Sequence, residues 1–256
     1  MSQQPYGPPQ QSHPHTPPRL GPVIRLAVVV DLAIAVSSVL DLVSVTQWQA
    51  LRGDVEELTT GEATDRLAQL GALGWATTLL NWGTIGIWIV LLLRMRANIE
   101  LRTPGRLQWK KETLVAVFVA PIALELASFV LPVLFLPATL FGLVTHILLI
   151  VMVNEIWRLG HPRRPGPASV LVIVWGVVGI LDELFFTMAS RWLAWEMLDL
   201  SFDIEASGDR ATVGTDLIPV SNAMSVAYVL DAFFGVVAIL MVWRLAAKHD
   251  EGLRTP

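Results

Sequence analysis

The sequence predicts an all-α protein, a polytopic integral membrane helix bundle with about six membrane segments. Three observations predict this class. Of the 256 residues, 54% are hydrophobic and only 16% are charged, whereas a soluble domain carries about a quarter charged residues. Apolar stretches long enough to cross a bilayer recur along the chain. Basic residues gather in alternate connections between those stretches.

Each predicted segment is an apolar run of about 20 residues, the length that crosses the hydrocarbon core as a helix. One run, Leu114–Trp157, is long enough for two passes and is broken by Pro121, Pro132 and Pro137. We therefore expect a membrane domain over 23–246, with segments at about 23–46, 67–93, 113–132, 137–157, 168–190 and 221–243. The third and fourth segments are either two full crossings or a re-entrant hairpin, which is tolerated only where protein covers it or a cavity adjoins it.

The positions of Lys and Arg predict the orientation. Fourteen of the 18 basic residues lie in the two terminal regions or in the connections after the second and fourth segments. The connections 47–66 and 191–220 hold the other four, together with eleven acidic residues. Because basic connections stay in the cytoplasm, we expect both termini inside the cell. The two acidic outer connections are long enough for small folded caps that contact partners in the envelope.

The ends of the chain differ from its apolar middle. Residues 1–22 are rich in Pro and Gln and cannot bury enough apolar area to fold, which predicts a disordered cytoplasmic tail. This tail is a spacer or, alternatively, a Pro-rich ligand for a partner. Residues 247–256 are expected to form a short cytoplasmic tail. The sequence has no cysteine, which excludes disulfides and thiolate metal sites.

Acidic residues fall inside the apolar segments, where a charged side chain costs about 2.5–3.5 kcal/mol. They are Asp31, Asp41, Glu125, Asp182, Glu183 and Asp231. In the first segment, positions 31, 35, 38 and 41 form a small and polar helical face that should meet other helices. No Lys or Arg lies deep enough to pair with these acids, and His146 is the single imidazole among the segments. Two interpretations stay open: a proton or cation pathway, or hydrogen bonds between helices made by protonated carboxyl groups.

Motifs of soluble enzymes are absent from the sequence. It lacks the nucleophile-elbow, zincin-helix and P-loop patterns, so we expect neither an enzymatic activity nor a cofactor. His13 and His15 are too few for a dedicated metal site, and no metal is expected. The glycine pairs in GTIG (83–86) and GVVG (176–179) predict close packing between helices.

Three passages carry a resemblance to a known family: RMRANIE at 94–100, VNEIWRLGHP at 153–162 and VWRLAAKHDE at 242–251. They resemble a membrane protein family known as domain of unknown function 4328, which is common in actinobacteria. The resemblance implies a multi-pass protein of the bacterial cytoplasmic membrane. The family has no established activity, so no catalytic residues are implied. Its proline-containing segment is shorter and carries an asparagine where this chain has Leu124 and Glu125.

The same passages contain a candidate cytoplasmic clamp formed by Arg94, Arg96, Glu155 and Arg158. Glu155 and Arg158 are three residues apart at one helix end and can form a surface ion pair. Alternatively, Glu155 meets Arg94 or Arg96 at the end of the second segment and ties the two helices together.

Two functional hypotheses follow from the sequence. The leading one is a non-enzymatic scaffold or component of an envelope complex, embedded in the lipid bilayer. Its expected partners are other membrane proteins or a second copy of the chain, and no nucleic acid is expected. The alternative is a small proton- or cation-linked transporter or channel that uses the intramembrane carboxylates.

Overall fold

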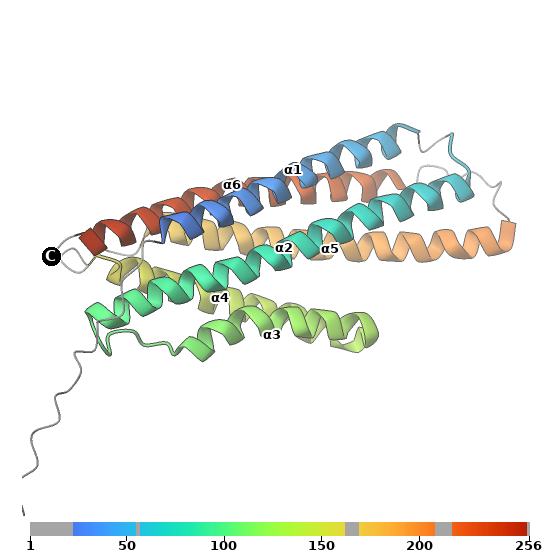
Figure 1. Ribbon diagram of the computed structural model, residues 1–256. Coiled ribbons are helices and arrows are strands. Elements are labelled where there is room, and N and C mark those ends of the chain that lie inside the picture. Colours follow the sequence, from blue (N-terminus) through green and yellow to red (C-terminus); the bar gives the residue numbers. More distant parts are fainter. Residues whose placement is uncertain (1–22, 55–56, 162–168, 208–216, 255–256) are drawn as a thin grey trace, which may run out of the picture.

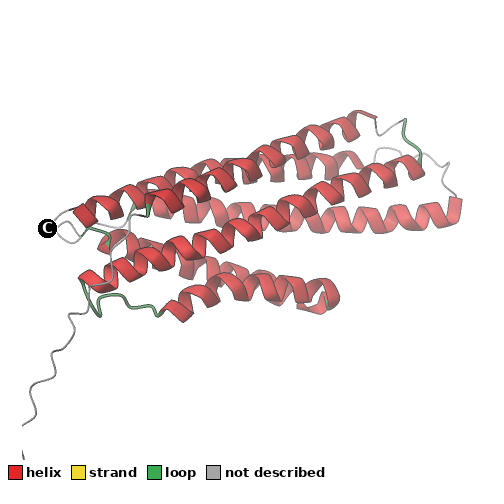
Figure 2. Cartoon of the chain, in the orientation of Figure 1, coloured by secondary structure: helices red, strands yellow, loops and turns green. Residues whose placement is uncertain are grey.

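A computed structural model describes residues 23–54, 57–161, 169–207 and 217–254. These residues form six α-helices, with no strand among them (Figure 2). The helices are α1 (Ile24–Asp54), α2 (Thr60–Arg102), α3 (Lys111–Val130), α4 (Phe135–Leu159), α5 (Val170–Ser207) and α6 (Leu217–Arg254). The all-α class is therefore confirmed. The predicted tail 1–22 lies outside the described residues.

Five of the helices, all except α3, are long and apolar enough to span a membrane. Their outward faces carry large apolar side chains; on α1 these include Leu32, Val36 and Val39. Such surfaces are unfavourable in water and favourable in lipid. The multi-pass membrane character predicted from composition agrees with both observations.

The helices lie side by side as an elongated bundle (Figure 1). α1 packs along α6, α2 packs against α1, and α5 packs against α6, while α3 and α4 form a hairpin beside them. We call the end that holds Arg102, Lys111 and Arg254 the basic end, and the opposite end, with Asp54 and Leu217, the far end. The α3–α4 hairpin starts at the basic end and stops short of the far ends of α2 and α5 (Figure 1).

Much of the two acidic connections belongs to the long helices. α2 has 43 residues and α5 has 38, which correspond to about 65 Å and 57 Å at 1.5 Å per residue. A hydrocarbon core is about 30 Å thick, so both helices must continue beyond it. The described parts of 47–66 and 191–220 are mostly continuations of α1, α2, α5 and α6. The described parts of these connections therefore extend the helices, because charged residues are also stable on the surface of a solvated helix.

Two of the three prolines of this region, Pro132 and Pro137, lie at helix boundaries. The chain reverses at the short 3₁₀ turn Pro132–Leu134, and Pro137 lies in the first turn of α4. A proline there breaks no helical hydrogen bond, since the first N–H groups have no acceptor within the helix. Pro121 lies inside α3. The predicted segments 113–132 and 137–157 thus correspond closely to α3 and α4.

The C-terminal residues 247–254 are part of α6, which corrects the expected tail at 247–256. The Asp250 carboxylate accepts hydrogen bonds from the backbone N–H groups of Val23 and Ile24, at 3.0 and 3.3 Å. These donors begin α1 and have no acceptor within that helix. The last turns of α6 therefore cap the start of α1.

The core consists of two hydrophobic clusters stacked along the bundle. The first fills the basic half around Leu91, Met95 and Leu245. The second fills the far end around Trp48, Leu70 and Met224. The aromatic rings of Trp88, Phe118, Trp175 and Phe234 belong to the first cluster or pack against it, and join α2, α3, α5 and α6. Polar side chains lie between the two clusters.

A layer of carboxyl groups inside the bundle

Carboxyl groups from several helices meet between the two hydrophobic clusters. Asp41 of α1 is 1% exposed and lies within electrostatic reach of Asp231 of α6 and Asp182 of α5. Asp182 interacts in turn with its neighbour Glu183, and Glu183 interacts with Glu125 of α3. We call these five residues the carboxyl layer. Five of the six acids picked out in the sequence therefore come together.

Asp31, the sixth acid, stands apart from the layer. It lies ten residues before Asp41, about 15 Å closer to the basic end along α1. Its Oδ1 atom is buried without a hydrogen-bond partner among the described residues. The expected small and polar face of α1 does meet another helix: Ser38 lies so close to Gly235 of α6 that a Cβ there would overlap its hydroxyl.

His146 of α4 adjoins the carboxyl layer. Its Nδ1 atom lies 3.4 Å from Glu183 Oε2. Two glycines make room for this pair, because a Cβ on Gly142 would come within 2.6 Å of Glu183 Oε1 and one on Gly179 within 2.8 Å of the His146 ring. The close packing predicted for GVVG is therefore confirmed. It was wrong for GTIG, since a Cβ on Gly83 or Gly86 would meet nothing within 4 Å.

Three polar residues of this region were missed in the sequence. The Ser37 hydroxyl of α1 donates a hydrogen bond to Asn81 Oδ1 of α2, at 2.5 Å. Tyr228 of α6 is 4% exposed and lies within electrostatic reach of Asp41 and Asp231. The sequence prediction centred on acidic residues inside the apolar segments, so it did not single out Asn81 or Tyr228. With these residues, all six helices contribute polar side chains at or beside the layer.

Several polar atoms of the layer have no hydrogen-bond partner among the described residues. They are Asp41 Oδ1, Asp182 Oδ1 and His146 Nε2. A buried polar atom without a partner costs free energy, so each of these atoms favours a proton, a water molecule or a solute beside it. A metal ion is not indicated, since the described residues contain no group of three or more His, Asp or Glu arranged to hold one. The layer thus places carboxyl groups of four helices close to one another and to the His146 ring.

The residues of the predicted clamp lie at the basic end but pair differently. Arg96 Nε and Nη2 donate to the Trp109 carbonyl, at 3.0 and 2.7 Å. Glu155 Oε1 accepts from the Gln108 backbone N–H at 3.0 Å. Among the described residues Glu155 forms no ion pair, and the side chains of Arg94 and Arg158 are exposed. The expected ion pairs are corrected accordingly: Arg96 and Glu155 both bind the backbone of the loop between α2 and α3.

This geometry predicts different changes in stability for two substitutions of Glu155. Glu155→Gln keeps an acceptor for the Gln108 N–H, so we expect little change in thermal stability. Glu155→Ala removes the acceptor and should lower the free energy of unfolding by about 0.5–1.5 kcal/mol. Thermal unfolding in detergent measures both variants, with Arg158→Gln as an exposed control. Equal losses in Glu155→Gln and Glu155→Ala would instead indicate that the charge itself matters.

A second cluster at the basic end was missed because it lies in the expected tail. His249 of α6 is 1% exposed, and its Nε2 atom lies 3.1 Å from Asn98 Nδ2 of α2. An amide nitrogen can only donate, so His249 accepts and its ring is neutral. Nearby, Arg102 donates to the Gly160 carbonyl at 3.3 Å. His249 lies beyond the predicted segment 221–243, and burial, followed by the charge of Arg102, lowers its pKa to about 3.

The chain matches no family model, no curated protein and no solved structure. The resemblance to domain of unknown function 4328 therefore stays a prediction.

Proposed function

We propose that this chain is a non-enzymatic scaffold or component of an envelope complex in the bacterial cytoplasmic membrane. In this proposal both termini face the cytoplasm and the far end of the bundle projects outside the cell. The concentration of Arg and Lys at the basic end supports the orientation. The carboxyl layer and the two glycine contacts then serve to hold the membrane helices together.

A contact between α4 and α5 supports two full crossings by α3 and α4. The Arg191 guanidinium lies 3.5 Å from the centre of the Phe135 ring, at the turn of the hairpin. Trp192 follows Arg191, and tryptophan and arginine are both favourable at a membrane surface. α3 is not among the five helices that are long and apolar enough to span a membrane, but its 20 residues measure about 30 Å and the 25 residues of α4 about 37 Å, close to the thickness of the hydrocarbon core.

The observation that carries the proposal is a row of exposed apolar side chains on α5. Met188, Trp195 and Phe202 are 71%, 66% and 58% exposed, and they recur every seven residues. A seven-residue spacing places them on one face of the helix. Trp195 and Phe202 lie beyond Arg191, where α5 has left the hydrocarbon core in the proposed topology. Large apolar side chains exposed in water mark surfaces that bind other proteins.

A photo-crosslinking amino acid at position 195 tests this surface in cells. We expect a discrete protein adduct from position 195, either with a second copy or with one other envelope protein. The control position is 181 on the same helix, where Leu181 is 58% exposed but lies within the membrane segment. Protein adducts that are absent at 195, or identical at 195 and 181, would contradict the proposal.

A second candidate function, proton-linked transport, is favoured by the carboxyl layer and His146. The two functions predict different results for one variant, Asp231→Asn. For a scaffold, liposomes that contain the wild-type protein should show no proton flux above empty liposomes, while Asp231→Asn changes the thermal stability. Flux is followed with a trapped pH-sensitive dye under an imposed pH gradient. A wild-type flux that Asp231→Asn abolishes, without loss of folded protein, would favour transport.

A further inference from the structure

A groove lies between α1 and α2 near the far end of the bundle. Its volume is about 430 Å³, and it is lined by side chains of both helices. Val43 of α1 and Leu73 of α2 lie at its inner level, Ala50, Leu51 and Leu70 are its other apolar residues, and Gln47, Gln69 and Arg66 are its polar residues. No functional residue identified above lies in this groove.

The polarity of the groove changes along the bundle axis. Val43 is two residues from Asp41 of the carboxyl layer, while Arg66 lies seven residues, about 10 Å, beyond Leu73 toward the far end. Gln47 and Gln69 lie between these two levels. The polar side chains of the groove therefore all lie on the far-end side of Val43 and Leu73, alongside the apolar Ala50, Leu51 and Leu70. An amphiphile aligned with the lipids of the bilayer matches this change.

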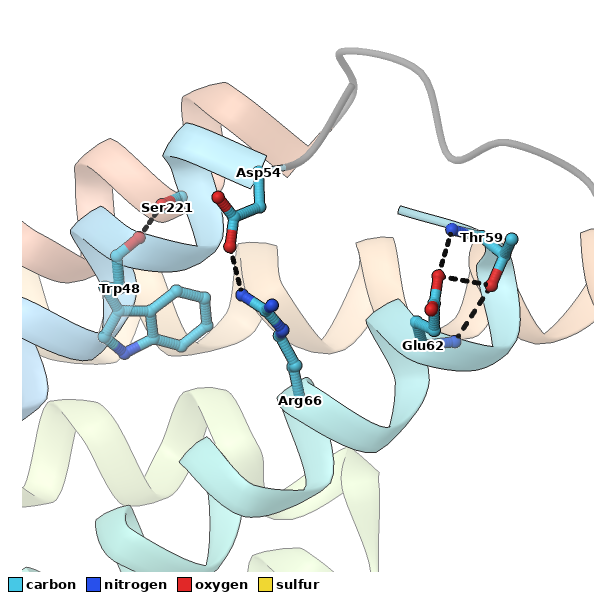
Figure 3. Close-up of polar contacts among 6 residues, drawn as sticks. All are labelled: Trp48, Asp54, Thr59, Glu62, Arg66 and Ser221. Carbon is cyan, nitrogen blue, oxygen red and sulfur yellow. Dashed lines mark hydrogen bonds and ion pairs between the residues drawn. The ribbon is translucent and has the colours of Figure 1, made fainter. Parts of the chain in front are cut away.

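One charge of each sign lies on the far-end side of the groove: Arg66, which lines it, and Asp54, which is paired with Arg66 but is not itself a lining residue. Arg66 Nη1 donates to Asp54 Oδ2 at 2.6 Å, which joins α2 to the last turn of α1 (Figure 3). Both side chains are about half exposed, at 42% and 52%, so they can also bind a ligand. A headgroup with a phosphate and an ammonium complements this pair, the phosphate at Arg66 and the ammonium at Asp54. A headgroup with only negative charge would leave Asp54 opposed to it.

We propose that this groove binds one zwitterionic phospholipid of the adjoining leaflet, with its headgroup at Arg66 and Asp54 and its upper acyl chain along Val43 and Leu73. Gln47 and Gln69 donate amide hydrogen bonds to the phosphate and ester oxygens. The site goes beyond the proposed scaffold function, because it needs neither the α5 surface nor a protein partner. Either orientation of the chain in the membrane leaves the groove in contact with a leaflet.

Native mass spectrometry of the purified full chain in detergent tests the proposal. The probes are phosphatidylethanolamine, phosphatidylglycerol and soluble phosphoethanolamine, each added at the same concentration. We expect one phosphatidylethanolamine to stay bound per wild-type chain under activation that removes phosphatidylglycerol. Arg66→Gln should lower phosphatidylethanolamine retention about tenfold, the effect of losing one charge-assisted hydrogen bond. Gln69→Leu should lower it less.

The matched control is Arg52→Gln, which removes an exposed arginine from the last turn of α1 outside the groove. It should retain the lipid as the wild type does. Equal retention by Arg66→Gln and Arg52→Gln would overturn the site in favour of non-specific lipid. Equal retention of the two lipids would overturn the headgroup assignment. If equimolar phosphoethanolamine displaced phosphatidylethanolamine, the ligand would be a soluble headgroup compound. The proposal that the groove binds a lipid would then be overturned. Because an exposed ion pair adds little stability, Arg66→Gln should fold, and circular dichroism verifies this.

Discussion

Replacing Gly176 by valine is expected to lower the free energy of unfolding by about 1–3 kcal/mol. Gly176 lies where α5 passes α4, and a single Cβ there would already overlap the side chain of Ile150. Valine adds two further methyl groups at this crossing, so α4 and α5 must move apart. Because the His146–Glu183 pair joins the same two helices, its 3.4 Å separation should increase as well. Thermal or denaturant unfolding in detergent measures the loss.

Gly83→Val is the matched control for this substitution. Both glycines lie inside apolar helices, so the change in helix propensity is the same, but Gly176 is buried and Gly83 is exposed. A Cβ on Gly83 would meet nothing within 4 Å, and we expect a change of less than about 1 kcal/mol. If the two variants lost equal stability, the close approach of α4 and α5 would not be the cause.

Acidification is expected to destabilise the basic end through His249. Its pKa is lowered to about 3 in the folded protein, against 6.5 for an ordinary histidine. Below pH 6.5 the unfolded chain takes up a proton that the folded chain cannot bind. The contribution of His249 is therefore complete above pH 6.5 and is lost as the pH falls toward 3. The free energy of unfolding should decrease by up to about 1.4 kcal/mol per pH unit across this interval.

His249→Gln tests this assignment. Glutamine can still pair with Asn98 but does not titrate, so the variant should show a shallower dependence of stability on pH between about 6.5 and 4. The measurement is the thermal midpoint of both proteins over this interval, with the difference between the two slopes as the readout. The carboxyl groups titrate in both proteins and cancel in that difference. Parallel slopes for wild type and variant would mean that His249 does not control the response.

The acids of the membrane core could be predicted because a charged side chain is rare and costly in an apolar segment. Asp41 and Asp231 stand alone among apolar residues, Asp182 has Glu183 beside it, and contact with other helices accommodates all three. Their depth along each segment follows from counting residues, so the position of the layer was largely determined by the sequence. Counting residues does not give the rotation of each helix about its own axis. The count therefore could not show which acids face one another across helices, such as Asp41 with Asp231 and Asp182.

The ends of the helices were harder to predict than the membrane core. Outside the hydrocarbon a charged residue is equally stable in a loop or on a helix, and so Asp54 indicated neither. The capping box at Thr59 and Glu62, which begins α2, was the available signal. The pairing of Glu155 was missed for a different reason. Its partner is a backbone N–H of a loop, and every residue except proline offers one, so the sequence cannot single it out.

The hydrogen bonds from Val23 and Ile24 to Asp250 bear on how the protein is made. The residues they join are 227 and 226 positions apart, so the acceptor is synthesised long after the donors. Until then the opening amides of the first helix lack this acceptor. Closure of the bundle at this end therefore waits for the synthesis of the last helix. A chain that stops before Asp250 would insert all its helices and leave the first one unsecured.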